Sequence, residues 1–154
     1  MLTINLICVG GLKEKFFKEA QDEYVKRLGR FCKIIVTEVK TAESLSVSID
    51  KQKDMESENL FLARRGKCIC FDRRGKKVDS EQFARMLQGL MIDGVSEISF
   101  LIGGSYGLSE KLLKETDMSI SFGDITLPHT LFRVVALEQI YRAFTILNNS
   151  SYHK

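Results

Sequence analysis

Two turns hold the residues of this chain that are best suited to bind a ligand. "GGSYG" at 103–107 follows the apolar run "EISFLI", and "FGDITLPH" at 122–129 contains the only proline, Pro128. Paired glycines let a backbone approach a flat ligand closely, because they lack a Cβ atom. Neither turn matches G-x-G-x-x-G or G-x-x-x-x-G-K-[ST], so no dinucleotide or nucleoside triphosphate is indicated. A plain strand-to-helix turn is the alternative at 103–107.

Two compact basic clusters, "ARRGK" at 63–67 and "DRRGKK" at 72–77, could bind phosphate. The alternative is a pair of solvated turns that flank a strand. A net charge of +3 predicts no nucleic-acid partner by itself. Phosphate binding is favoured where a cluster shares a rim with other functional loops.

The cysteines and histidines do not indicate a metal site or a disulfide framework. Cys68 and Cys70 share one face of a predicted strand, a spacing that suits buried thiols in a reducing cytosol. The two histidines are far apart in the sequence and do not supply the further ligands that a zinc site needs. No apolar stretch approaches the roughly 18 residues that cross a membrane. The start, "MLTINLICVGG", has no basic region and indicates a first strand rather than a signal peptide. We expect a cytoplasmic protein without a metal.

Apolar periodicity and turn residues predict five strands that alternate with five helices, in one domain of 154 residues. Ser80 and Ser109 are the expected caps of the third and fourth helices. This alternation is typical of an α/β fold, in which helices flank a mostly parallel sheet. We predict strands at 2–9, 33–39, 67–71, 97–102 and 118–122, and helices at 13–28, 49–64, 81–92, 110–116 and 130–147.

Ligands of parallel sheets bind outside the carboxyl ends of the strands. The segments that leave the strands at this edge are 10–11, 72–77, 103–107 and 123–129. The second basic cluster lies on this rim, whereas the first lies at the opposite end of its strand. The candidate RNA-binding residues are therefore Arg73, Arg74, Lys76 and Lys77.

Three segments closely resemble the ribosomal RNA large-subunit methyltransferase H family of the SPOUT superfamily. They are "FLIGGSYGLSE", "SFGDITLPHTLFRVVALEQIYRAF" and the terminal "SYHK", and the resemblance spans nearly the whole chain. It implies one SPOUT domain over residues 1–154, with a C-terminal trefoil knot and a homodimeric assembly. The implied reaction transfers a methyl group from S-adenosylmethionine to N3 of a pseudouridine in 23S ribosomal RNA, with the assembled ribosome as the expected substrate.

The resemblance also implies the residues of the cofactor pocket. The family often has leucine where Phe71 stands, and an aromatic ring there should still cover the adenine. Pro128 fixes its own φ and favours an extended Leu127, so it should end the cofactor loop and begin the last helix. The implied cofactor residues are Phe71, Gly103, Phe122, Gly123, Asp124, Ile125, Thr126 and Leu127.

Methyl transfer from a sulfonium needs alignment and a deprotonated nitrogen rather than a metal. We expect Arg142 to stabilise the developing anion, and His153 or Tyr152 to accept the proton or stack on the base. The resemblance implies that this tail completes the site of the partner subunit. The alternatives are an Arg142–Glu138 surface pair and a disordered tail. His129 is expected to order its loop rather than to do chemistry.

The last helix is apolar around more than one stripe, which predicts burial on two sides. One side can meet the sheet and the other a second subunit, in an isologous contact. A fully interior helix of a monomer is the alternative. The apolar residues are Leu131, Val134, Val135, Leu137, Ile140, Tyr141, Phe144 and Leu147.

Two functions of other classes stay open from the sequence. One is a non-catalytic ribosome- or RNA-binding module, which would not bind S-adenosylmethionine. The other is a nucleotide-binding enzyme or regulator of flavodoxin-like build, which would bind a flavin or nucleoside phosphate tightly. Neither accounts for the combination of "LPH" with the terminal "SYHK".

Overall fold

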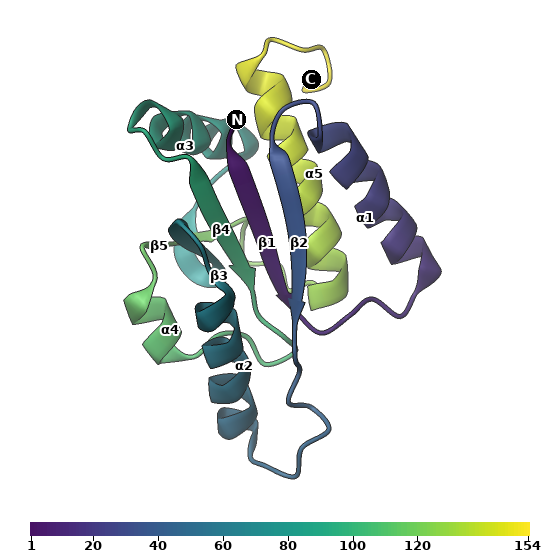
Figure 1. Ribbon diagram of the computed structural model, residues 1–154, viewed down its shortest axis with the longest axis vertical. Helices are drawn as coiled ribbons and strands as arrows, with labels where there is room; N and C mark the ends of the chain where they lie inside the picture. The colour runs from purple at the N-terminus through teal and green to yellow at the C-terminus, as the bar shows by residue number, and fades with distance from the viewer.

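The computed structural model describes all 154 residues as five strands that alternate with five helices (Figure 1). This is the order that the sequence predicts, and most bounds agree within two residues. The elements are β1 (Thr3–Val9), α1 (Lys15–Leu28), β2 (Lys33–Val39), α2 (Ile49–Ala63), β3 (Lys67–Lys77), α3 (Ser80–Ile92), β4 (Glu97–Ile102), α4 (Glu110–Glu115), β5 (Met118–Ser121) and α5 (His129–Leu147).

The strands form one sheet in the order β2-β1-β4-β3-β5, and every neighbouring pair is parallel. The α/β prediction with a mostly parallel sheet is confirmed. Strands that are covered by helices on both faces are apolar throughout. Six of the seven residues of β1 and five of the six residues of β4 are accordingly buried.

Two helical layers cover the two faces of the sheet. α5 packs between α1 and α3 on one face, and α2 and α4 lie on the other (Figure 1). Adjacent residues of β1 divide between the two cores, because successive side chains of a strand point to opposite faces. Leu6 belongs to the larger core beneath α1, α3 and α5, and Ile7 to the smaller core beneath α2 and α4.

β3 is longer than the sequence predicts. We expected it to end at Phe71, with 72–77 as a loop, but the strand continues to Lys77. A register shift follows Phe71, after which Lys76 pairs with Ile120 of β5. A Cβ atom on Gly75 would lie 2.6 Å from the carbonyl carbon of Ser119, so only glycine fits at this position. Polar residues can continue the strand here because β3 beyond Phe71 pairs only with β5, and its side chains are mostly exposed.

The cap of α3 also differs from the prediction. Asp79 rather than Ser80 is the N-cap, and its carboxylate accepts a hydrogen bond from the Gln82 backbone N–H at 2.7 Å. The Gln82 side chain accepts one from the Asp79 N–H at 2.8 Å, which completes a capping box. At α4 the predicted cap is confirmed, since the Ser109 hydroxyl accepts from the Leu112 N–H.

All four cysteines are buried and free, as the sequence predicts. None of the helices is both long and apolar enough to cross a membrane.

Candidate functional site

A cavity of about 580 Å³ lies at the carboxyl edge of the sheet, between the ends of β3, β4 and β5. The turn at 103–108 and the loop at 121–127 form two of its walls, and the first turns of α5 form another. The structure therefore brings together the two turns that the sequence singled out. The volume is typical of pockets that hold small ligands, which span about 300–1,000 Å³.

An aromatic cluster forms the base of this pocket. Phe71 lines it and is 7% exposed. Its ring lies 5.0 Å from that of Phe122 and 5.1 Å from that of Phe132, and it stacks on Phe100 at 5.3 Å. Such packing holds a flat apolar wall in one position, as recognition of a flat ring system requires.

Backbone contacts within the turn require glycine at position 103. A Cβ atom there would lie 2.8 Å from the carbonyl carbon of Gly107. The Gly107 N–H donates to the Gly104 carbonyl at 3.1 Å, which closes the turn. Any side chain at position 103 therefore deforms the turn, rather than only filling the pocket.

Beneath the turn lies the buried carboxylate of Glu56, on α2. A Cβ atom on Gly104 would lie 2.8 Å from the Glu56 Oε1 atom. Glu56 Oε2 accepts hydrogen bonds from the Thr41 hydroxyl at 2.8 Å and the Ala42 N–H at 2.9 Å. One carboxylate thus fixes the connection after β2 close beneath the glycine turn.

The loop at 122–127 begins with a turn held by the buried hydroxyl of Ser121. This hydroxyl donates to the Gly123 carbonyl at 3.0 Å and accepts from the Gly123 N–H at 3.1 Å. Gly123 has a φ of 126°, which side chains rarely adopt. Further along, Ile125 is 82% exposed and lines the pocket with Thr126 and Leu127.

Of the implied cofactor residues, only Asp124 does not line the pocket. Its carboxylate points instead to Lys77, at 2.6 Å from the Nζ atom. The hydrogen bond and the positive charge of Lys77 lower the pKa of Asp124. This pair joins the loop at 122–127 to the end of β3.

The four basic candidates divide into two paired and two unpaired cations. Lys77 is paired with Asp124, and Arg74 contacts both Asp72 and Glu110. The hydrogen bonds that Arg74 donates to these two carboxylates raise the pKa of its guanidinium. Arg73 lines the rim of the pocket, and neither Arg73 nor Lys76 forms an ion pair. The two unpaired side chains are the ones free to meet a phosphate.

The proposed catalytic residues Arg142, Tyr152 and His153 lie together at the other end of α5. Arg142 Nη2 lies 2.6 Å from Glu138 Oε1, so the predicted i, i+4 pair is present. Arg142 Nη1 also lies 3.2 Å from His153 Nδ1, and its guanidinium is 4.9 Å from the centre of the Tyr152 ring. The tail is packed against α5 rather than disordered.

The Tyr152 hydroxyl donates a hydrogen bond to Glu138 Oε1 at 3.1 Å. Burial, together with its contacts to Tyr24 and Glu138, raises the pKa of Tyr152 to about 12. A phenol of this pKa stays protonated at neutral pH and is a poor proton acceptor there. Of the two proposed acceptors, this favours His153.

Within one chain the tail and the pocket do not meet. Phe132 lines the pocket, and Arg142 follows ten residues later, which is about 15 Å along a helix. Figure 1 shows the C-terminus at the amino edge of the sheet, and the start of α5 at the opposite edge. One chain therefore does not bring Arg142 and His153 to its own pocket.

Sequence reasoning missed Arg133, which is the largest fully buried side chain. Its Nη1 atom lies 2.6 Å from Glu38 Oε2, and its Nη2 atom donates to the Gly10 carbonyl at 2.8 Å. Arg133 thereby fixes the start of α5 against the ends of β1 and β2. Its place among the apolar residues of α5 was the available signal, since a cation at such a position needs a buried partner.

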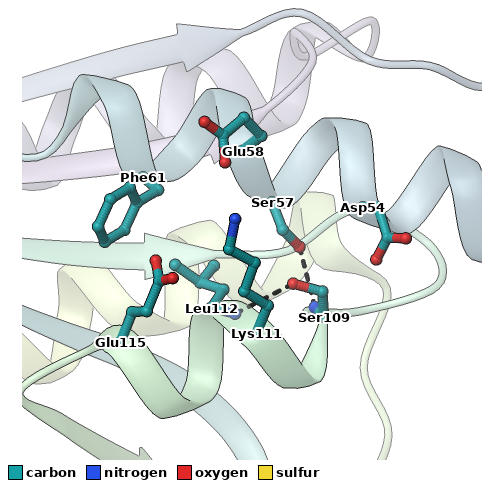
Figure 2. A pocket seen from close by; sticks show the side chains of 8 residues that line it. All are labelled: Asp54, Ser57, Glu58, Phe61, Ser109, Lys111, Leu112 and Glu115. Carbon is teal, nitrogen blue, oxygen red and sulfur yellow. Dashed lines mark hydrogen bonds between the residues drawn. The ribbon is translucent and has the colours of Figure 1, made fainter.

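A second pocket of about 340 Å³ lies between α2 and α4 (Figure 2). Ser57 accepts a hydrogen bond there from the Ser109 N–H at 2.9 Å, which joins the two helices. Three carboxylates and one ammonium line this pocket, and carboxylates repel a polyanion such as RNA. The charged residues are Asp54, Glu58, Lys111 and Glu115. No group of three or more histidine, cysteine or acidic side chains in the chain could hold a metal.

The family described as "Predicted SPOUT methyltransferase" matches residues 2–153. A protein of Limosilactobacillus reuteri (strain DSM 20016), named "Ribosomal RNA large subunit methyltransferase H", is 47% identical over 99% of this chain and all of its own length. A protein of Clostridium perfringens (strain SM101 / Type A), named "Ribosomal RNA large subunit methyltransferase H 1", is 41% identical with the same coverage.

Solved structures share the fold at low sequence identity. A probable methylase family protein from Haemophilus influenzae Rd KW20 matches 99% of this chain and 70% of its own, with a TM-score of 0.53 and 14% identity. The structure of a putative methyltransferase from Legionella pneumophila, in complex with the bound cofactor SAM, matches 93% of this chain and 66% of its own. Its TM-score is 0.50 and its sequence identity is 15%. These two likenesses show the fold alone.

Proposed function

Since the chain belongs to the SPOUT methyltransferase family, and within it to the ribosomal RNA large subunit methyltransferase H family, we propose that it transfers a methyl group from S-adenosylmethionine to large-subunit ribosomal RNA. The finer proposal is that the acceptor is N3 of a pseudouridine in 23S ribosomal RNA. The assembled ribosome in the cytoplasm is the proposed substrate. No metal is part of the proposed reaction.

The observation that carries this proposal is the convergence of the two turns on one cavity with an aromatic base. We place the adenosyl group between the glycine turn and the loop at 122–127, against Phe71. Apart from Arg73 and Asp72, no charged side chain lines this pocket. Backbone N–H and C=O groups of the two turns would therefore recognise the adenine edge.

The bound donor supplies a methyl group that its sulfonium already activates. The residues of the chain have to align the acceptor nitrogen and stabilise its anion. If the pKa of that imide lies ~2–3 units above neutral pH, ionisation costs roughly 3–4 kcal/mol. The Arg142 guanidinium would offset part of this cost, and His153 would receive the proton.

Assembly into a homodimer is part of the proposal, because one chain leaves Arg142 far from its own pocket. α1 buries only Leu28, and Phe16 on the same helix is 64% exposed. On the neighbouring α5, Leu131 and Val134 are only half-buried. An isologous contact of α1 and α5 would cover these residues and place each tail at the partner's pocket.

We also propose a single methyltransferase domain over residues 1–154, with the trefoil knot that its family implies. The segment between β5 and α5 is the one that would be threaded, because it leads from the edge strand to a helix packed between α1 and α3. Pro128, with a φ of −55°, ends that segment. Threaded chains are rare among folds.

The test is to incubate the protein and labelled S-adenosylmethionine with ribosomes that lack the modification, and to map the methylated nucleotide. We expect label at N3 of one pseudouridine of 23S ribosomal RNA. Label at another nucleotide would contradict the finer proposal, and no label in RNA from any ribosomal preparation would contradict the whole. RNA binding without donor binding would favour a non-catalytic module.

A Gly103→Ala variant tests where the donor binds. Its Cβ atom would meet the Gly107 backbone and displace the turn, so we expect donor affinity to fall at least tenfold in calorimetry. Circular dichroism should show that the sheet and helices are retained. Unchanged donor affinity would mean that the pocket lies elsewhere.

A further inference from the structure

We propose that a separate pocket beside the edge strand β5 binds a nucleotide that flanks the methylated one in the RNA. This inference rests on the proposed function. The pocket has a volume of about 480 Å³ and lies between α3, the end of β3 and β5. It is distinct from the cofactor pocket, with which it shares only Ile120.

Two cations and no acidic side chain line this flanking pocket. They are Lys76, at the end of β3, and Arg85, on α3. Both are exposed, and neither takes part in an ion pair or a side-chain hydrogen bond. In contrast, Arg74 and Lys77 on the same segment are held by carboxylates. The free positive charges at this pocket suit a phosphate group.

The floor of the flanking pocket is apolar. Val78, Met86 and Met118 line it, and all three are half-buried and packed against the larger core. Methionine sulfur makes favourable contacts with aromatic rings and adapts to their shape. A nucleobase is an aromatic ring joined to a phosphate-bearing sugar. A floor of methionine with cations beside it therefore matches one nucleotide.

The position of the flanking pocket fits a strand of RNA that also enters the cofactor pocket. Arg73 lies at the rim of the cofactor pocket, and Lys76 follows it by three residues, within the irregular segment after Phe71. Ile120, with which both Phe71 and Lys76 pair, lines both pockets. The tight contact of Gly75 with β5 fixes this segment in place. The two unpaired cations thus form a track from one pocket to the next.

A protein strand that pairs with the free edge of β5 is the other occupant to be tested. The two unpaired cations and the absence of a lining carboxylate favour RNA.

The first experiment compares Lys76→Gln and Arg85→Gln with Lys114→Gln, which removes an exposed cation on α4. Donor affinity should be unchanged in all three variants. The kcat/KM for ribosomes that lack the modification should fall about tenfold in the first two and stay at the wild-type value in the third. The slope of log kcat/KM against log salt should decrease by about one in each of the first two. Equal kcat/KM values in the three variants would overturn the inference.

The second experiment observes the methyl signals of the five methionines by NMR. A short uridine oligoribonucleotide should shift Met86 and Met118 but not Met1 or Met55. Sodium phosphate at the same concentration should leave Met86 and Met118 unchanged, and an equal shift would overturn the base contact. Without any RNA-induced shift, the flanking pocket is wrong and a protein partner on β5 is favoured.

The two proposals fail in different ways. If no ribosomal preparation is methylated while RNA still shifts Met86 and Met118, the proposed function is wrong, and binding of a nucleotide at this pocket is still supported. If ribosomes are methylated equally by the wild type and Arg85→Gln, only the flanking pocket is wrong.

Discussion

At the scale of single residues, the tail shows how burial and neighbouring groups together oppose a role as a base. Tyr152 donates to Glu138, and its pKa is raised to about 12. A phenol held in this way contributes a hydroxyl and an aromatic face, rather than a base. Arg142 lies on that face and also reaches His153, so the three side chains form one unit.

We predict that Tyr152→Phe keeps the shape of the pH profile of kcat/KM, because the phenol stays protonated across the neutral range. The rate should fall less than about tenfold. His153→Gln should change the profile itself. Loss of one limb of the profile in Tyr152→Phe alone would assign proton transfer to the phenol.

The same pKa has a consequence for stability, whose sign follows from linkage. The phenol is raised from an ordinary value of 10.0 to about 12 in the fold, so the unfolded chain loses this proton first. Its contribution to stability is complete below about pH 10 and is lost as the pH rises toward 12. Between pH 10 and pH 12, the free energy of unfolding measured in urea should fall less in Tyr152→Phe than in the wild type.

Arg133 is the residue at which the sequence was least informative. Its place among the apolar residues of α5 indicated burial, and it is 1% exposed, but the sequence did not indicate its partner. Its partner Glu38 is on β2, 95 residues away. Contacts between such distant positions depend on the tertiary fold, and local patterns do not contain them.

We predict that Glu38→Gln destabilises the protein by about 2 kcal/mol, because it leaves the buried guanidinium without a counter-charge. This loss of stability is smaller than is usual for a buried ion pair, because the Glu38 side chain is 46% exposed. Glu23→Gln is the matched control, because it removes an exposed i, i+4 pair worth less than about 0.5 kcal/mol. Equal urea midpoints in the two variants would contradict this role for Arg133.

At the scale of elements, apolar periodicity was sufficient for helices and buried strands, and insufficient where backbone pairing decides. β2 and β4 have the predicted bounds. The extension of β3 through "DRRGKK" was missed, because its residues are polar and its pairing with β5 follows a register shift. This extension carries Arg73 and Lys76, so the missed element is also the one on which the flanking pocket depends.

We predict that Pro128→Ala lowers both stability and donor affinity. The proline is in a trans peptide bond and joins the loop at 122–127 to α5. Without the proline, the unfolded chain has more conformational freedom, which lowers the stability of the fold by about 0.4–1 kcal/mol. The loop that forms one wall of the pocket would also be less restrained. Urea unfolding and calorimetry with S-adenosylmethionine would measure the two effects, and Thr130→Ala is the control. Wild-type donor affinity would show that the loop does not need this restraint.

At the scale of the whole molecule, the 15-residue helix α2 and the 19-residue helix α5 contact different parts of the proposed site. α2 supports the glycine turn from below through Glu56. α5 contributes to the pocket at its first turns and to the tail cluster at its last turns. A single chain therefore has the pocket at one edge of the sheet and the tail cluster at the opposite edge, and the proposed dimer would bring the pocket of one chain to the tail of the other.

The last prediction tests this arrangement with two inactive variants. Gly103→Ala damages the pocket, and Arg142→Ala damages the tail, so each homodimer should lack methyl transfer. In co-expressed chains about half of the dimers are mixed, and each mixed dimer has one site with an intact pocket and an intact partner tail. The mixture should therefore regain roughly a quarter of the wild-type activity. If both parents are inactive, a mixture that is equally inactive would mean that Arg142 acts on the pocket of its own chain.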